Sequence, residues 1–241
     1  GNYLGKKDAV SKHYMSKNEI FADAVNFYFF DGREKVKPED LEELDSSELV
    51  LPYGKSTGRR GIKGNGVQGR AALSVPVQKY RDILKRCVIR RCQETVYMIY
   101  GIEAQSDIHY AMPVKNMVYD ALQYAKQVEE AAASHKLSGD YKGVDSDEYL
   151  SGFMKADHLL PVVTLVIYFA SKEWDGPLSI HEMFAGQDAR VLAFVPDYKI
   201  NLIAPAAIED SEFEKFQTTL KEVLSFIKYS GNADKLQEVI G

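Results

Sequence analysis

A carboxylate and an amide stand two residues apart near the middle of the chain, as Glu103 and Gln105 in the stretch Tyr97–Tyr110. The apolar residues before them predict a buried strand, and side chains at positions i and i+2 of a strand point to the same face. Burying such polar groups is costly unless a partner meets them. A metal ion or a phosphate is such a partner, so the stretch predicts a site for one of these at the strand end.

A second carboxylate, Asp82, precedes a basic stretch that reads as a strand. A hairpin turn near Cys87–Glu94 and a strand over Thr95–Ile102 would then bring Asp82 near Glu103. Hard divalent cations such as Mg²⁺ prefer carboxylate oxygens, and a bound metal polarises a phosphoryl oxygen and activates a water. Gln105 could orient that water. Asp82, Glu103 and Gln105 are therefore the candidate catalytic residues, with Mg²⁺ or Mn²⁺ as the cofactor.

Two further carboxylates, Glu19 and Asp23, lie four residues apart on one face of a helix predicted over Asn18–Phe29. They form either a solvated acidic edge or part of the metal site. The pattern does not decide which of the two carboxylates assists the metal. We take Glu19 as the predicted third metal ligand.

Composition indicates a soluble protein with a substantial core, because 45% of its 241 residues are hydrophobic and 27% are charged. A net charge of −5 does not point to nucleic-acid binding, although a local basic stripe or a bound metal can make the electrostatic potential of one surface positive. The basic stripe here contains Arg86, Arg90 and Arg91. Two Cys residues without further ligands indicate reduced thiols and a cytoplasmic protein. No signal peptide is apparent, and the longest apolar run is too short to cross a bilayer, so no membrane partner is expected.

Alternating helices and apolar strands predict a single α/β domain over residues 1–241, with a Gly-rich insertion loop at 54–69. A strand covered on both faces is expected over Leu159–Ala170. An extended segment is expected over Val191–Ile203, and a short helix or a connector over Lys37–Glu48. Further helices are predicted over Pro113–His135, Asp145–Phe153 and Ser211–Tyr229. The helix over Pro113–His135 carries a broad apolar stripe of Val114, Met117, Val118, Ala121, Leu122, Ala125 and Val128.

The stretch GIEAQSDIHYAMPVKNMVYDALQYAKQ resembles the core of the recombination-promoting nuclease family, a transposase-like branch of the PD-(D/E)XK nuclease superfamily. The family pattern places E-x-Q-S before a helix that carries Met, Arg and Tyr. Its counterparts here are Glu103, Gln105, Ser106, Met112, Lys115 and Tyr119. Further likeness is found in NEIFADAVN, in Tyr80-Arg81-Asp82, in WDGP and in FVPDYKINLI, so the resemblance runs from about Asn18 to Tyr229.

This resemblance implies a restriction-endonuclease-like core, a mixed central sheet flanked by helices, and Mg²⁺-dependent hydrolysis of DNA. It implies that Asp82 and Glu103 hold the metal and that Gln105 is the third motif residue. Gln105 stands where most of the superfamily has Lys. Lys115 stands where this branch has Arg, so it is either a single-point phosphate contact or a solvated helix charge.

Three functions stay open at this point. The first is a metal-dependent DNA endonuclease linked to recombination or mobile elements, with Lys115, Arg86, Arg90 and Arg91 on the DNA. The second is a catalytically silent module of the same fold that binds nucleic acid or a partner protein. The third is an RNA-directed nuclease or toxin. A fold does not fix a substrate, and the sequence also leaves open whether the chain forms a homodimer.

Overall fold

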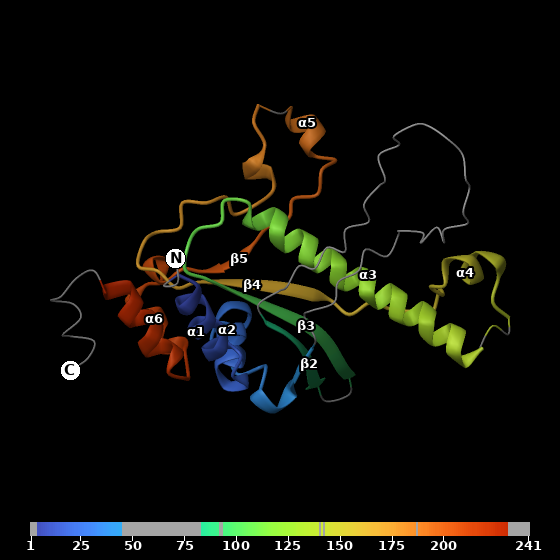
Figure 1. The fold of residues 1–241 in the computed structure, drawn as a ribbon, viewed down its shortest axis with the longest axis horizontal. Helices are drawn as coiled ribbons and strands as arrows, with labels where there is room; N and C mark the ends of the chain where they lie inside the picture. The colour runs from blue at the N-terminus through green and yellow to red at the C-terminus, as the bar shows by residue number, and fades with distance from the viewer. Residues whose placement is uncertain are drawn as a thin grey trace, which may run out of the picture.

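The computed structural model describes residues 4–44, 83–91, 94–139, 141, 143–186 and 188–230. Its centre is a five-stranded mixed sheet in the order β1-β2-β3-β4-β5 (Figure 1). The strands β1 (Leu41–Glu43), β2 (Ile83–Arg91) and β3 (Glu94–Gln105) are antiparallel neighbours. The strands β4 (Val162–Tyr168) and β5 (Asn201–Ile203) run parallel to β3. The predicted α/β class and the predicted pairing of the two central strands are therefore confirmed.

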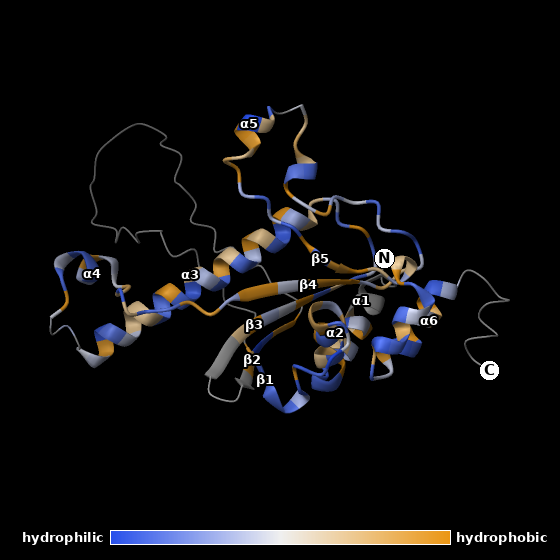
Figure 2. Ribbon diagram, turned by 180° about the vertical axis from the view of Figure 1, so that it is seen from behind, coloured by the Kyte–Doolittle hydropathy of each residue, from blue (hydrophilic) through white to orange (hydrophobic). Residues whose placement is uncertain are grey.

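Helices cover both faces of this sheet. One face carries α1 (Leu4–Met15), α2 (Asn18–Phe30) and α6 (Leu220–Tyr229), and the other carries the long helix α3 (Met112–Ser138) (Figure 1). The main core lies on the α1–α2 face, where Phe21 packs with Tyr100 and Ile102 of β3. Figure 2 shows apolar residues along most of β4 and β5, while α3 alternates apolar and polar positions. The predicted strand over Leu159–Ala170 is confirmed as the buried strand β4.

The helix α2 ends where its sequence predicts. Its apolar residues are buried from Ile20 to Val25. Asp31 and Gly32 then adopt left-handed backbone conformations with φ of 55° and 73°, which ends the helix and favours Gly at the second position. A Cβ atom at Gly32 would also lie 2.7 Å from Lys215. Gly32 therefore lets the end of α2 approach the segment around Lys215 closely.

Short elements complete the chain. They are η1 (Pro38–Asp40), α4 (Ser146–Ser151), η2 (His181–Met183), α5 (Ala189–Leu192), η3 (Pro205–Ala207) and η4 (Asp210–Lys215). The segment over 37–48 thus contains a short helical turn and also the edge strand β1, up to the last described residue, Leu44. The segment predicted as extended over Val191–Ile203 is extended only in its second half, because its first residues belong to α5.

The prediction of a single helix over Ser211–Tyr229 is wrong. The chain forms η4, breaks at Phe216–Thr219 and then forms α6. The break is held by the buried carboxylate of Asp23, which accepts hydrogen bonds from the backbone N–H groups of Gln217 and Thr218 at 2.9 Å each and from the Thr218 hydroxyl at 2.5 Å. A distant residue therefore supplies the acceptors that let the chain restart as α6.

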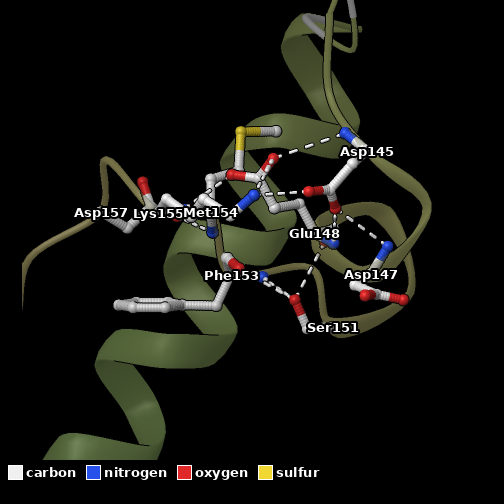
Figure 3. Close-up of polar contacts among 8 residues, drawn as sticks. All are labelled: Asp145, Asp147, Glu148, Ser151, Phe153, Met154, Lys155 and Asp157. Carbon is white, nitrogen blue, oxygen red and sulfur yellow. Dashed lines mark hydrogen bonds and ion pairs between the residues drawn. The ribbon is translucent and has the colours of Figure 1, made fainter.

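A lobe around α4 packs on the far end of α3 (Figure 3). Asp145 caps α4 by accepting the N–H groups of Asp147 and Glu148 at 3.0 and 2.9 Å. Its carboxylate also receives the Lys155 ammonium at 2.5 Å. His135 of α3 pairs with Asp157 at 2.9 Å. These contacts confirm the short helix predicted over Asp145–Phe153 and fasten the lobe to α3.

No helix in the described ranges has the length and apolar content that a membrane span requires. The Gly-rich stretch 54–69 lies outside the described residues, as does Asp82.

Candidate functional site at the end of strand β3

The last residues of β3 carry the candidate site. Glu103 is fully buried, and it pairs in parallel register with Val166 of β4. Ile102 packs in the core under α1 and α2, so Glu103 faces α3 on the opposite side of the sheet. Gln105 follows on the same face and is half-buried. The structure therefore brings Glu103 and Gln105 to one face at the carboxyl ends of two parallel strands.

Lys115 of α3 forms an ion pair with Glu103. The Lys115 Nζ lies 3.0 Å from the Glu103 Oε2, and it also lies 5.8 Å from the centre of the Tyr119 ring. The Glu103 side chain is 1% exposed and the Lys115 side chain is 23% exposed. A buried carboxylate is strongly destabilising unless a positive charge meets it. The Lys115 ammonium supplies that charge while it keeps contact with solvent, a role that neither of its sequence interpretations anticipated.

A row of polar side chains continues along the same face of α3. Asn116 is fully buried, and neither its amide nitrogen nor its amide oxygen has a hydrogen-bond partner in the described part of the chain. One turn further on, Asp120 accepts hydrogen bonds from the hydroxyls of Thr164 and Tyr198, each at 2.6 Å. A buried amide without partners costs about 1–3 kcal/mol. A polar ligand at Asn116 would recover part of that energy.

The apolar stripe predicted on α3 is confirmed at Leu122, which is buried with Val118 packed beside it, and is wrong at Val114 and Met117. Val114 and Met117 are 39% and 38% exposed, whereas Asn116 and Asp120 are buried. The sequence signal that could have revealed this is the spacing of Met112, Asn116 and Asp120, because positions four apart share one face of a helix. Polar residues at that spacing within a helix that must cover a sheet indicate a polar interface.

The third proposed metal ligand is not brought to this site. Glu19 is exposed on α2, which covers the face of the sheet opposite to the Glu103 side chain. Its alternative, Asp23, is also on α2 and is occupied in holding the start of α6. Within the described ranges, no three His, Cys, Asp or Glu residues converge to hold a metal. Of the proposed ligands, the structure therefore places Glu103 alone in the site, and Asp82 is not among the described residues.

Glu103 nevertheless fits a hard divalent cation. It offers carboxylate oxygens at a buried position, and the Asn116 amide oxygen is a second hard donor on the facing helix. Glu103 and Asn116 are thus the described side chains whose chemistry suits Mg²⁺ or Mn²⁺.

The basic residues Lys85 and Arg86 of β2 lie on opposite faces of the sheet and have different partners. Arg86 pairs with Glu42 of β1, the residue opposite it in the sheet, through two guanidinium contacts. Lys85 is buried on the other face, and its Nζ donates to the Ser16 carbonyl at 2.7 Å and to the Asn18 side chain at 2.6 Å. Burial lowers the pKa of the Lys85 ammonium. The side chains of Arg90 and Arg91 lie outside the described residues.

No family model, no curated protein and no solved structure matches this chain. The observations that bear on function are therefore the positions of Glu103, Lys115 and Gln105 at the end of β3.

Proposed function

We propose that the chain is a metal-dependent nuclease that hydrolyses phosphodiester bonds in DNA, with its site at the end of β3. The observation that carries this proposal is Glu103, a fully buried carboxylate paired at 3.0 Å with a partly exposed lysine. Open α/β sheets bind ligands beyond the carboxyl ends of their parallel strands, which is where Glu103 and Gln105 lie. Ionisable groups held in such surroundings are frequent at functional sites.

The fold supports the proposal at a coarse level. The mixed sheet with helices on both faces is compatible with a single restriction-endonuclease-like domain over residues 1–241, with 54–69 as an inserted loop. In such a domain Asp82 is the second metal carboxylate. Ile83, the next residue along the chain, pairs with Ile102 immediately before Glu103.

Each proposed residue has a distinct role. Glu103 and Asp82 hold Mg²⁺ or Mn²⁺, which when bound supplies a Lewis acid for a phosphoryl oxygen and a more acidic water. Gln105 orients the attacking water through its amide. Lys115 places a positive charge beside Glu103 at the solvent side, where it would meet a phosphate oxygen. Linkage to recombination or mobile elements follows from the resemblance and is part of the proposal.

DNA is the proposed partner, and Arg86, Arg90 and Arg91 are its proposed backbone contacts. Arg86 shares its charge with Glu42, so its contribution should be smaller than that of an unpaired arginine. Binding through phosphates should weaken as salt rises, in proportion to the number of contacts. Reversing the charges of Arg90 and Arg91 without weakening DNA binding would rule out this surface.

A plasmid cleavage assay with Mg²⁺ or Mn²⁺ tests the proposal. Glu103→Gln and Asp82→Ala should each lower the cleavage rate by about 100-fold or more, the size expected when a catalytic interaction is lost. Glu130→Gln is the matched control, because Glu130 is an exposed carboxylate on α3. Equal cleavage by the wild type and by Glu103→Gln would overturn the assignment of the site.

A catalytically silent binding module is the second candidate. The observation that favours it is that Lys115 already balances Glu103, while no three-ligand metal group occurs among the described residues. This candidate predicts that the wild type binds DNA or a partner protein without cleaving DNA under either metal, and that Glu103→Gln leaves binding unchanged. An RNA substrate in the same assay separates an RNA-directed nuclease or toxin from a DNA endonuclease.

A further inference from the structure

A cavity of about 640 Å³ lies beside β5, at the opposite end of the sheet from β1. Its walls are the last turn of α2, the residues of β5 and the segment from η3 to η4. Neither Glu103 nor Lys115 lines it. Cavities of this size are typical of small-molecule sites in proteins. The cavity is therefore a second candidate site, separate from the one at the end of β3.

The lining of this cavity combines large apolar and aromatic side chains with the charged residues Asp31, Arg33, Glu212 and Lys215. Its lining includes Phe27, Tyr28, Phe30, Leu178, Leu202 and Ile208. Tyr28 and Leu178 remain 38% and 44% exposed at its edge. Large apolar side chains exposed together around a hollow mark a surface that an apolar ligand can cover. The lining thus fits a ligand with an apolar body.

The walls are held in place by specific contacts. Lys215 of η4 pairs with Asp31 at 2.7 Å and with Glu212 at 2.6 Å, so it joins the end of α2 to η4. The hydrogen bond from Lys215 lowers the pKa of Asp31 below its ordinary value. Gly32 lies so close to Lys215 that no Cβ would fit there. A cavity with walls fixed in this way exists before the ligand arrives, which reduces the entropy lost on binding.

Arg33 supplies a cation at the edge of the cavity. Its Nε donates to the Phe30 carbonyl at 3.0 Å, which orients the guanidinium. In the described part of the chain Arg33 forms no ion pair, whereas the two nearby carboxylates are both held by Lys215. A guanidinium with free terminal N–H groups binds a carboxylate through two parallel hydrogen bonds.

We infer that this cavity binds a small amphipathic carboxylate, with its apolar body among Phe27, Phe30 and Leu202 and its head group on Arg33. The inference stands on the cavity, its lining and Arg33, and it is independent of the proposed nuclease activity. Charge complementarity selects a carboxylate over a neutral or cationic head group, because Arg33 is the one charged residue of this lining that forms no ion pair within the described ranges, while Asp31 and Glu212 are paired with Lys215.

Calorimetric titration with three ligands of one chain length tests this inference. Octanoate should bind with saturation, and octanol and octylammonium should bind at least about tenfold more weakly, the loss expected without the charge-assisted bonds. Octanol binding as tightly as octanoate, stronger binding of octylammonium, or no saturable binding of octanoate at millimolar concentration would each overturn the inference.

Two variants and a control locate the site. Arg33→Gln should weaken octanoate about tenfold while leaving octanol unchanged. Ala207→Trp, which adds a large ring to the lining, should abolish binding of both ligands. Arg190→Gln is the control, because Arg190 is an exposed arginine on α5 away from the cavity. An unchanged melting temperature shows that each variant is folded, and an unchanged octanoate affinity in folded Arg33→Gln contradicts the assigned head-group contact.

Discussion

Replacing Lys115 with Met removes the charge that allows Glu103 to be buried. The two side chains meet at 3.0 Å, and Glu103 is 1% exposed. Removing one partner of a fully buried pair costs about 3–5 kcal/mol, because the other charge is left without compensation. Lys115 is 23% exposed, so water already reaches the pair and lowers its contribution. We therefore expect Lys115→Met to lower the free energy of unfolding by about 2–4 kcal/mol.

The second variant, Glu103→Gln, should lower the free energy of unfolding by less than Lys115→Met does. It leaves Lys115 with access to water through its exposed side, so its ammonium is not trapped. In the double variant no uncompensated carboxylate is buried, and it should be more stable than the sum of the single changes predicts. The expected coupling energy is about 1–3 kcal/mol, within the range for residues in direct contact.

Urea denaturation followed by circular dichroism measures these values. Lys126→Met is the matched control, since Lys126 lies on the same helix, is half-buried and forms no ion pair among the described residues. It should change stability by less than about 0.5 kcal/mol. Additive effects of Lys115→Met and Glu103→Gln would show that the pair contributes nothing, and the argument from a buried carboxylate would then fail.

Three further outcomes are expected elsewhere in the fold. Asp23→Ala should destabilise the chain by about 2–4 kcal/mol, because three hydrogen bonds at the start of α6 lose their acceptor; a loss below about 0.5 kcal/mol in urea denaturation would contradict that role. Burial raises the pKa of Cys87 to about 11, so in a Cys92→Ser variant this thiol should react with iodoacetamide at pH 8 only after unfolding, and fast labelling of the native protein would refute it. The backbone N–H of Met154 lowers the pKa of Asp157. The contact between Asp157 and Met154 is therefore complete above the ordinary Asp pKa of about 4 and is lost as the pH falls below it. The protection factor of the Met154 amide proton, its exchange rate relative to an unstructured peptide at the same pH, should fall over that range, and a constant protection factor down to pH 2 would exclude the contact.

The elements that sequence predicts well are those whose signals are local. The helix α2 has apolar residues at helical spacing and a turn signal at Asp31 and Gly32, and the structure ends it there. The strand β4 is mostly apolar and β-branched, and it is buried on both faces. The shared face of Glu103 and Gln105 follows from the two-residue period of a strand alone.

The features that sequence does not predict depend on distant contacts. The break before α6 is set by Asp23, which is 194 residues away from Gln217 along the chain. The partner of Glu103 lies on a helix whose rotation cannot be fixed by an amphipathic pattern, because Lys115 and Asn116 could each have faced solvent. Only the packing of α3 against β3 and β4 decides which residues are buried.

The two faces of the sheet differ in the kind of side chains that they bury. Under α1, α2 and α6 lies the main apolar core, which supplies most of the burial that stabilises the fold. The buried polar side chains of Asp23, Asn26 and Lys85 on this face all have hydrogen-bond partners. Under α3 the sheet buries Glu103, Asn116 and Asp120 instead, and each of these costs free energy unless its partners are complete. Asp120 has two hydroxyl partners, so it is explained by structure alone. Asn116 has none among the described residues, and Glu103 is balanced by a lysine that reaches solvent. A fold that needed only stability would place apolar side chains at these two positions, and this is why we assign the proposed site to the end of β3 rather than to the face under α1, α2 and α6.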